Sequence, residues 1–291
     1  MANLKEIRNR IASVGSTMQI TSAMKMVSAA KLKRAQDAIS QMRPYAEKMK
    51  EILANLSATL DISENAYSDE REVDNVLIVG ITSNRGLCGG FNNNIIKKVN
   101  KLIVEDYKDS QVSVLCLGKK IKDTFKKGDL YFINDEIAPA EDIFADLTFE
   151  NAGIITNGMM NLFTSKKIDR VVIVYNKFVN AANQDIMVEQ LLPIVPSEQD
   201  EGSSPVDYIF EPNKEDIVDD LIPKTLKVQL FKGLLDSQAA EHGARMTAMH
   251  KATDNASDLQ KELKLSYNKA RQAAITNEIL EIVGGAEALN G

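Results

Sequence analysis

A long stripe of small and apolar residues in the last third of the chain constrains the fold most. It lies in a stretch from about Lys224 to Val283 that reads as one very long helix. About 60 helical residues would span roughly 90 Å, so such a helix needs another element to lie against. The stripe repeats with the 3.5-residue spacing of a coiled coil, at Met249, Ala252, Ala256, Leu259, Leu263, Ser266, Ala270, Ala273, Asn277 and Leu280.

The other end of the chain supplies a matching helical block at residues 3–60. One heptad stripe is set by Leu4, Ile7, Ile11, Val14 and Met18, and a second, in a shifted phase, by Met42, Tyr45, Met49, Ile52 and Leu56. The phase shift predicts an irregular supercoil, and Pro44 is expected to kink or end the regular part. Pro223 is likewise expected to bend the first turns of the last helix. Pairing the two terminal blocks antiparallel is the simplest way to bury both stripes.

Between the helical blocks, strand and helix patterns alternate, which predicts a mainly parallel sheet covered by helices. A polar, acidic connection leads into a nearly continuous β-branched run typical of a buried parallel strand. We expect strands at residues 73–81, 111–117, 129–133, 170–178 and 188–195. A glycine-rich turn at 84–90 follows the first strand, and we expect helices from this turn to about residue 107, at 119–126 and at 139–165.

The predicted fold class is therefore α/β, with a Rossmann-like domain inserted into a long antiparallel coiled coil. We divide the chain into an N-terminal helix at 1–62, the inserted domain at 73–205, and a foot segment with the C-terminal helix at 207–291. Low aromatic content, 5% with no Trp, suits long helices better than a thick globular core.

The charge is unevenly spread. The net charge is −6, yet residues 1–50 hold ten Lys and Arg against three Asp and Glu. A basic helix on an acidic protein favours an acidic partner surface, although a solvated charged face is an alternative. Nucleic acid is disfavoured, because stacking aromatics are missing there and the pI is about 5.2.

The sequence also indicates a compartment. No apolar run approaches the roughly 20 residues that cross a bilayer, and the start lacks the apolar core of a signal peptide. A mitochondrial presequence is disfavoured by Glu6 and by the direct continuation into a helical pattern. Cys88 and Cys116 lack metal-ligand or disulfide spacing, so we expect buried free thiols in a reducing compartment.

Candidate chemical sites do not assemble into an active site. The turn around Gly86 lacks the Gly-Lys-Ser/Thr of a phosphate loop, and its glycines do not fit G-x-G-x-x-G. His242 and His250 are eight residues apart, unlike a helical zinc pair, and have Glu241 and Asp254 nearby as charge partners. Glu278 and Glu281 share a helix face without a sign of an enclosed pocket. We expect no catalytic residues, no cofactor and no metal.

Three stretches resemble the gamma subunits of F-type ATP synthases, of the bacterial type, and together they cover nearly the whole chain. They are residues 7–21 with 23–27, the turn at 84–92 with Asn-Arg-Gly-Leu-Cys-Gly-Gly-Phe-Asn, and a C-terminal set at 244–246, 252–256, 267–272, 275–278, Glu281 and 285–286. One departure is Asn84, where the family usually has Asp, which puts in doubt any charge at this turn.

The resemblance implies a rotor that couples proton flow through the membrane sector to ATP synthesis or hydrolysis. In that family the paired terminal helices form a shaft inside three alpha and three beta subunits, and the beta subunits hold the catalytic sites. The α/β domain docks with epsilon and the ring of c subunits. The resemblance thus implies a non-catalytic peripheral protein on the cytoplasmic side of the bacterial plasma membrane. We expect one copy per complex, because the sequence has no internal repeat and its charge is lopsided, and the apolar tail at 279–283 suits a smooth bearing.

Site residues follow from the same resemblance, position by position. Contacts to the beta subunits are implied for Met24, Lys25, Arg245, Arg271, Gln272, Thr276 and Glu278. Contacts to the c ring or epsilon are implied for Tyr208 and Glu211. Two other classes remain open from the residues alone: a coiled-coil tether with an α/β head, which would self-assemble, and a nucleotide-dependent enzyme, which would bind its ligand at the Gly86 turn.

Overall fold

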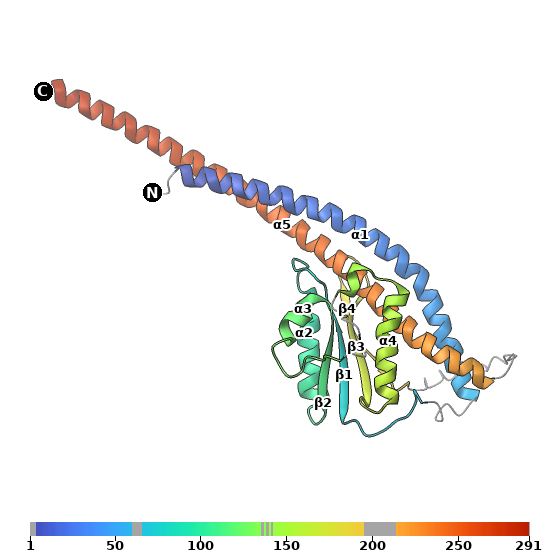
Figure 1. Cartoon of the computed structure of the whole chain (residues 1–291). Coiled ribbons are helices and arrows are strands. Elements are labelled where there is room, and N and C mark those ends of the chain that lie inside the picture. The colour runs from blue at the N-terminus through green and yellow to red at the C-terminus, as the bar shows by residue number, and fades with distance from the viewer. Residues whose placement is uncertain are drawn as a thin grey trace. The chain divides into compact units, whose positions relative to one another are not determined.

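The structure is a computed structural model that describes residues 4–59, 66–134, 137, 140, 142–194 and 214–290 (Figure 1). It divides into two compact units. The first holds the residues up to Ser28 together with those from Met246 onward, and the second spans Ala29–Arg245. Two helices, α1 (Leu4–Thr59) and α5 (Lys214–Asn290), each contribute to both units. The units therefore cut across the three segments predicted from the sequence.

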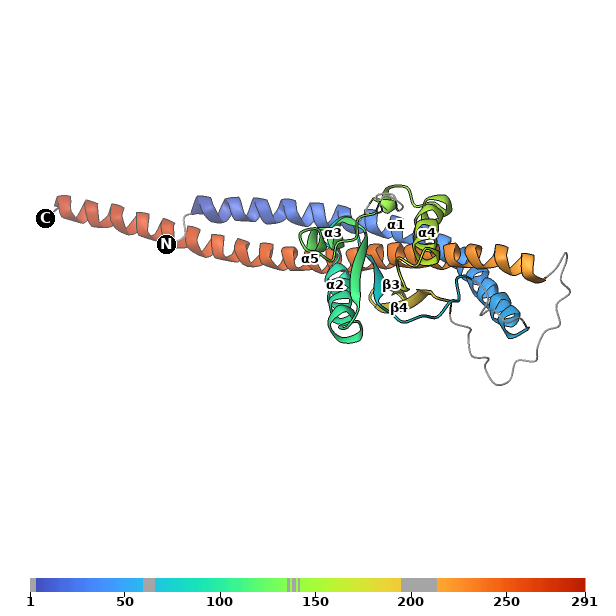
Figure 2. The ribbon, with the colours of Figure 1, turned by 60° about the horizontal axis from the view of Figure 1, so that its bottom comes forward.

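In the first unit, α1 and α5 lie side by side and antiparallel (Figures 1 and 2). The contacts show the register directly. Arg8 donates a hydrogen bond to Tyr267, Thr21 meets Thr253, and Lys25 meets His250. As the α1 number rises, the α5 number falls by the same amount within one residue. The predicted antiparallel pairing within one chain is confirmed.

The α5 side of this interface differs from the predicted stripe. Met249, Ala256 and Leu263 are buried as expected, and Ala252 and Ala270 are half-buried. Three residues outside the predicted stripe are half-buried as well, each four positions after a buried one: Thr253, Gln260 and Tyr267. Leu259, predicted to lie in the seam, is 41% exposed. Both spacings fit a coiled coil. Thr253 and Tyr267 are half-buried because they contact Thr21 and Arg8 of α1.

The last part of the predicted stripe is also wrong. Every residue from 271 to 286 is exposed, including Ala273, Asn277 and Leu280. The register explains this exposure, because the first described residue of α1, Leu4, pairs with α5 at about residue 271. In the first unit, α5 therefore continues past the described end of α1.

The buried face of α1 keeps one phase, contrary to the predicted shift. Tyr45 is 53% exposed, whereas Ile39 and Met49 are buried and Ala46 is half-buried. A spacing of alternating three and four residues thus runs from Leu4 to Met49. Neither proline ends its helix, since α1 passes through Pro44 and α5 passes through Pro223.

The second unit contains a four-stranded sheet in the order β2-β1-β3-β4. Strands β1 (Asn75–Ile81), β2 (Gln111–Leu117) and β3 (Arg170–Phe178) are parallel, and β4 (Gln184–Leu192) runs antiparallel to β3. Strands β1, β2 and β3 match the prediction closely because their β-branched runs are bounded by polar residues. β4 starts four residues earlier than expected and ends before Pro193, which cannot donate to the ladder.

Helices cover both faces of this sheet (Figure 2). One face packs on α2 (Phe91–Lys101), its π-helical continuation η2 (Leu102–Asp106) and α3 (Lys119–Phe125). The other face packs on α4 (Phe149–Thr164) and on the α5 residues Ile222, Leu226, Leu230 and Leu234. The core of the domain is therefore completed by the terminal helix, and the predicted covered α/β sheet is confirmed.

Two predicted elements are shorter than expected. Residues 129–133 form only an isolated bridge, between Tyr131 and Val114, and Ile133 is 79% exposed. The helix predicted for 139–165 begins at Phe149, because Thr148 caps it by accepting a hydrogen bond from the amide of Asn151. A short 3₁₀ turn, η3 (Ile143–Ala145), precedes it.

Tyr208 and Glu211 lie outside the described residues, as does the whole segment 195–213, which holds the start of the predicted foot segment. Among the described helices, none combines the length and the apolar character needed to cross a bilayer.

Candidate partner surface and the turn beside α5

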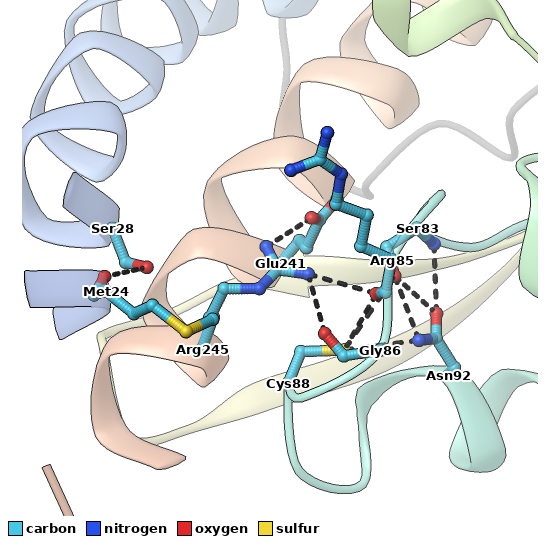
Figure 3. Close-up of polar contacts among 9 residues, drawn as sticks. All are labelled: Met24, Ser28, Ser83, Arg85, Gly86, Cys88, Asn92, Glu241 and Arg245. Carbon is cyan, nitrogen blue, oxygen red and sulfur yellow. Dashed lines mark hydrogen bonds and ion pairs between the residues drawn. The ribbon is translucent and has the colours of Figure 1, made fainter. Parts of the chain in front are cut away.

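The turn after β1 is held by its own side chains (Figure 3). The amide of Ser83 donates to Asn92 Oδ1 at 2.9 Å, and the Ser83 hydroxyl donates to the carbonyl of Arg85 at 2.6 Å. Asn92 Nδ2 lies 2.9 Å from Ser83 Oγ and 3.2 Å from Cys88 Sγ. Leu87 has a positive φ of 63°, a conformation that a non-glycine residue rarely adopts.

This geometry does not suit a phosphate loop. Such a loop points successive backbone amides at the ligand. Here the amides at the borders of the turn, those of Ser83, Phe91 and Asn94, donate within the chain. The carbonyls of Arg85 and Gly86 point instead toward a guanidinium. The turn fits a cation better than an anion.

That guanidinium belongs to Arg245 on α5, whose side chain is only 10% exposed. Its Nη1 atom is 2.5 Å from Glu241 Oε1, and its Nη2 atom donates to the carbonyls of Arg85 at 3.0 Å and Gly86 at 3.2 Å (Figure 3). Burial raises the pKa of Glu241, and the adjacent Arg245 counters that shift. Burial also raises the pKa of the Cys88 thiol, so this thiol is not poised as a nucleophile.

Asn84 keeps the function of an acceptor. Its Oδ1 accepts a hydrogen bond from the amide of Lys119, at the start of α3, at 3.0 Å. An amide oxygen and a carboxylate oxygen can both accept here. An Asp at this position could accept the same hydrogen bond, so this contact does not require a charge.

A second polar cluster joins α1, α5 and the sheet inside the second unit. Arg43 Nη2 donates to Asp236 Oδ1 at 2.7 Å and to the carbonyl of Phe178 at 2.9 Å. Asp236 is fully buried. Tyr175 donates its hydroxyl to Glu189 at 2.7 Å, and burial together with that carboxylate raises the tyrosine pKa. The sequence patterns gave no sign of this cluster, since a single Arg and Asp on distant helices carry no local motif.

The predicted partner residues are placed in two groups. On α1, Met24 and Lys25 are half-buried, and Lys25 Nζ lies 3.4 Å from His250 Nδ1. On α5, Arg271, Gln272, Thr276 and Glu278 are all exposed, and the Thr276 hydroxyl donates to the Gln272 carbonyl at 2.9 Å. Arg245 differs from both groups, because its side chain is engaged inside the second unit. The partner roles of these residues stay predictions.

The histidines and cysteines follow the sequence reading in part. His250 pairs with Asp254 at 3.3 Å as expected, but Glu241 pairs with Arg245 rather than with His242. Cys88 and Cys116 are buried free thiols, as predicted. Among the described residues, no group of three His, Cys, Asp or Glu side chains could hold a metal ion.

Comparisons with known proteins agree across the whole length. The ATP synthase family matches residues 3–289. ATP synthase gamma chains of Christiangramia forsetii and Flavobacterium johnsoniae are each 60% identical, over the full length of both chains.

Solved structures share the fold at lower identity. A chain in the cryo-EM structure of the Euglena gracilis mitochondrial ATP synthase, with OSCP, F1 and c-ring, is 20% identical with a TM-score of 0.68, covering 98% of this chain and 94% of that one. A chain in the central stalk and c-ring structure of the Tetrahymena thermophila enzyme is 24% identical with a TM-score of 0.56, covering 80% and 99%. Because gamma chains are 60% identical to it over the full length, this chain belongs to the ATP synthase gamma-chain family.

Proposed function

We propose that this chain is the central rotor shaft of an F-type ATP synthase and has no active site of its own. The observation that carries this proposal is the C-terminal part of α5. Residues 271–286 are exposed on every side although they include Ile275, Ile279 and Ile282. Large exposed apolar patches mark interaction sites. A helix that is apolar yet bare on all sides suits an enclosing ring of partners.

The partners follow from the family. We infer three alpha and three beta subunits around the shaft, with epsilon and a ring of c subunits at the α/β domain. The chain would be peripheral, on the cytoplasmic side of a bacterial plasma membrane. Support comes from the relatives, which are named gamma chains, and from a structural neighbour described as the rotor of a mitochondrial ATP synthase.

Contact residues are proposed on the exposed faces. Arg271, Gln272, Thr276 and Glu278 present polar groups around the C-terminal part of α5, where they would meet the beta subunits. Met24 and Lys25 would meet an acidic part of beta, which suits the positive charge of the first 50 residues. Tyr208 and Glu211 are proposed to meet the c ring or epsilon.

Co-purification tests this function. A tagged chain expressed in its own host should bring down the alpha and beta subunits. Native mass spectrometry of that complex should show one copy of this chain per three beta subunits. Two or three copies per ring would favour a symmetric scaffold, and a self-associated chain alone would favour the tether. Calorimetry of the isolated chain with ATP and Mg²⁺ should show no saturable heat, and micromolar binding would favour the enzyme.

A further inference from the structure

We propose that Arg245 is a positioning residue that fastens the turn at residues 84–92 to α5, so that the α/β domain and this helix turn as one body. The inference rests on the proposed rotor function. It assigns Arg245 a task inside the chain, in place of the partner contact implied by the family resemblance.

The contacts of Arg245 are all internal to the second unit. One guanidinium nitrogen pairs with Glu241 and another donates to the carbonyls of Arg85 and Gly86. Both charged side chains are nearly buried, at 10% and 12% exposure. Hydrogen bonds from a charged donor in such surroundings are stronger than neutral ones. The side chain has little surface left for a partner.

The receiving turn is built to hold its shape. Ser83, Cys88 and Asn92 tie its two ends together, and Asn84 ties it to the start of α3. A force applied to α5 through Arg245 therefore reaches β1, α2 and α3 without passing through a loose loop. The same holds in the opposite direction.

The position of Arg245 along α5 supports the assignment. It is the last α5 residue of the second unit, and α5 continues unbroken into Met246. Two other contacts tie α5 to the sheet further back. Asp236 pairs with Arg43 of α1, which also donates to the Phe178 carbonyl on β3. Gly243 lies so close to the turn between β3 and β4 that a Cβ would come within 3.2 Å of Ala181 Cα. Arg245 makes the last of these contacts along α5 before the helix enters the first unit.

A rotor needs this attachment under load. If the α/β domain receives torque from the membrane sector, a loosened turn would let that domain yield before α5 moves. ATP hydrolysis would continue, since no catalytic group is lost, while the proton transport obtained per ATP would fall.

The experiment uses the assembled complex carrying Arg245→Ala, Arg245→Lys or Arg34→Ala. Arg34→Ala is the matched control, because it removes an exposed arginine side chain of the second unit and leaves the turn at 84–92 and Glu241 unchanged. Two quantities are measured in each complex. One is hydrogen exchange of the amides at 83–92, and the other is ATP-driven proton pumping at equal rates of ATP hydrolysis.

Arg245→Ala should speed exchange at 83–92 by about tenfold or more, since two charge-assisted hydrogen bonds are lost. Pumping at equal hydrolysis should fall several-fold, and Arg34→Ala should change neither quantity. Arg245→Lys should lie between them, because an ammonium lacks the guanidinium fork, and it keeps the test available if the alanine variant does not assemble.

If Arg245→Ala leaves exchange at 83–92 unchanged, the fastening role is overturned. If pumping nevertheless falls in that variant, Arg245 acts through a direct partner contact. Faster exchange with unchanged pumping overturns the mechanical role. Failure of the rotor function itself looks different, because then the unaltered chain would not assemble with alpha and beta subunits.

Discussion

The hydroxyl oxygens of Thr21 and Thr253 lie 2.8 Å apart across the α1–α5 pair of the first unit. Each hydroxyl also bonds to its own helix, Thr21 to the Met18 carbonyl and Thr253 to the Met249 carbonyl. Two hydroxyls carry only two protons, so only two of these three hydrogen bonds can form at any moment. A polar pair inside a coiled-coil seam sets the register of the helices at some cost in stability.

Replacing either threonine alone with valine should therefore destabilise the helix pair by about 0.5–1.5 kcal/mol. The double replacement should cost less than the sum of the two, because no hydroxyl is then left facing a methyl group. Urea unfolding of the isolated chain, followed by circular dichroism, measures the four free energies of the cycle. Strict additivity would mean that the two hydroxyls do not interact.

Two glycines should respond in opposite ways to alanine. At Gly15 a Cβ would meet only the mobile end of Gln260, and alanine favours a helix by about 1 kcal/mol over glycine. Gly15→Ala should be neutral or stabilising. At Gly118 φ is +113° and a Cβ would lie 2.1 Å from the Thr82 carbonyl oxygen, so Gly118→Ala should cost more than about 2 kcal/mol. Thermal midpoints of the two variants provide the comparison, and equal shifts would contradict it.

The elements that were predicted best are those whose burial follows from their own residues, without regard to the neighbouring elements. The strands at 111–117 and 170–178 have the expected bounds, because nearly continuous apolar runs fix a buried parallel strand whatever surrounds it. The segment at 129–133 failed for the opposite reason. Its pattern looks like a strand, but it reaches the edge of β2 only at the bridge between Tyr131 and Val114. There the Val114 amide donates to the Leu130 carbonyl and the Phe132 amide donates to the Val114 carbonyl.

The interface between α1 and α5 could be predicted from the sequence only in part. The apolar pattern selected Leu259, whereas the residue that faces α1 is its neighbour Gln260. Which of two adjacent rows of α5 residues faces α1 depends on the size of the α1 side chains opposite. Gly15 of α1 leaves room for the long polar side chain of Gln260. Arg245 was missed as an internal contact for a similar reason, since its acceptors are backbone carbonyls 160 and 159 residues away.

Acid should weaken the second unit through His242. Burial lowers the pKa of this imidazole to about 4, and Arg245 and Lys31 act in the same direction. Its Nδ1 atom is buried without a hydrogen-bond partner among the described residues. Between pH 6.5 and 4 the unfolded chain binds a proton that the folded chain does not, so the free energy of unfolding should fall as the pH drops through this window, by about 1–3 kcal/mol.

Urea midpoints of the normal chain and of His242→Leu, measured at steps from pH 7 to pH 4.5, isolate this contribution. The variant should lose less stability over that range, since it has no imidazole to protonate. Parallel curves would contradict the assignment and would place the acid sensitivity on carboxylates.

Lys25 provides a test of the proposed acidic partner surface. In the assembled complex, Lys25→Glu should reduce ATP-driven proton pumping more than ATP hydrolysis, while the complex still forms. Single charges near the surface contribute little to stability, so folding should change by less than about 1 kcal/mol. Lys97→Glu makes the same charge change on an exposed position of α2 and serves as the control. Normal pumping with Lys25→Glu would count against the contact.

Two substitutions on α5 should distinguish the stability of the isolated chain from its assembly with partners. Ile279 is 54% exposed, whereas Leu263 is 9% exposed on the same helix, inside the pair with α1. Serine at 279 should leave the stability of the isolated chain within about 0.5 kcal/mol, because little apolar area is buried there. Alanine at 263 should cost about 2–4 kcal/mol, since it opens a cavity in the seam.

The order reverses in the complex if partners enclose the end of α5. Ile279→Ser should then weaken retention of the alpha and beta subunits during purification, whereas Leu263→Ala should act only through the stability of the chain. Thermal midpoints of the isolated variants, set beside the amount of beta subunit that co-purifies with each, test both halves of the prediction. Loss of stability with Ile279→Ser in the isolated chain would mean that this part of α5 folds back on its own chain or on a second copy.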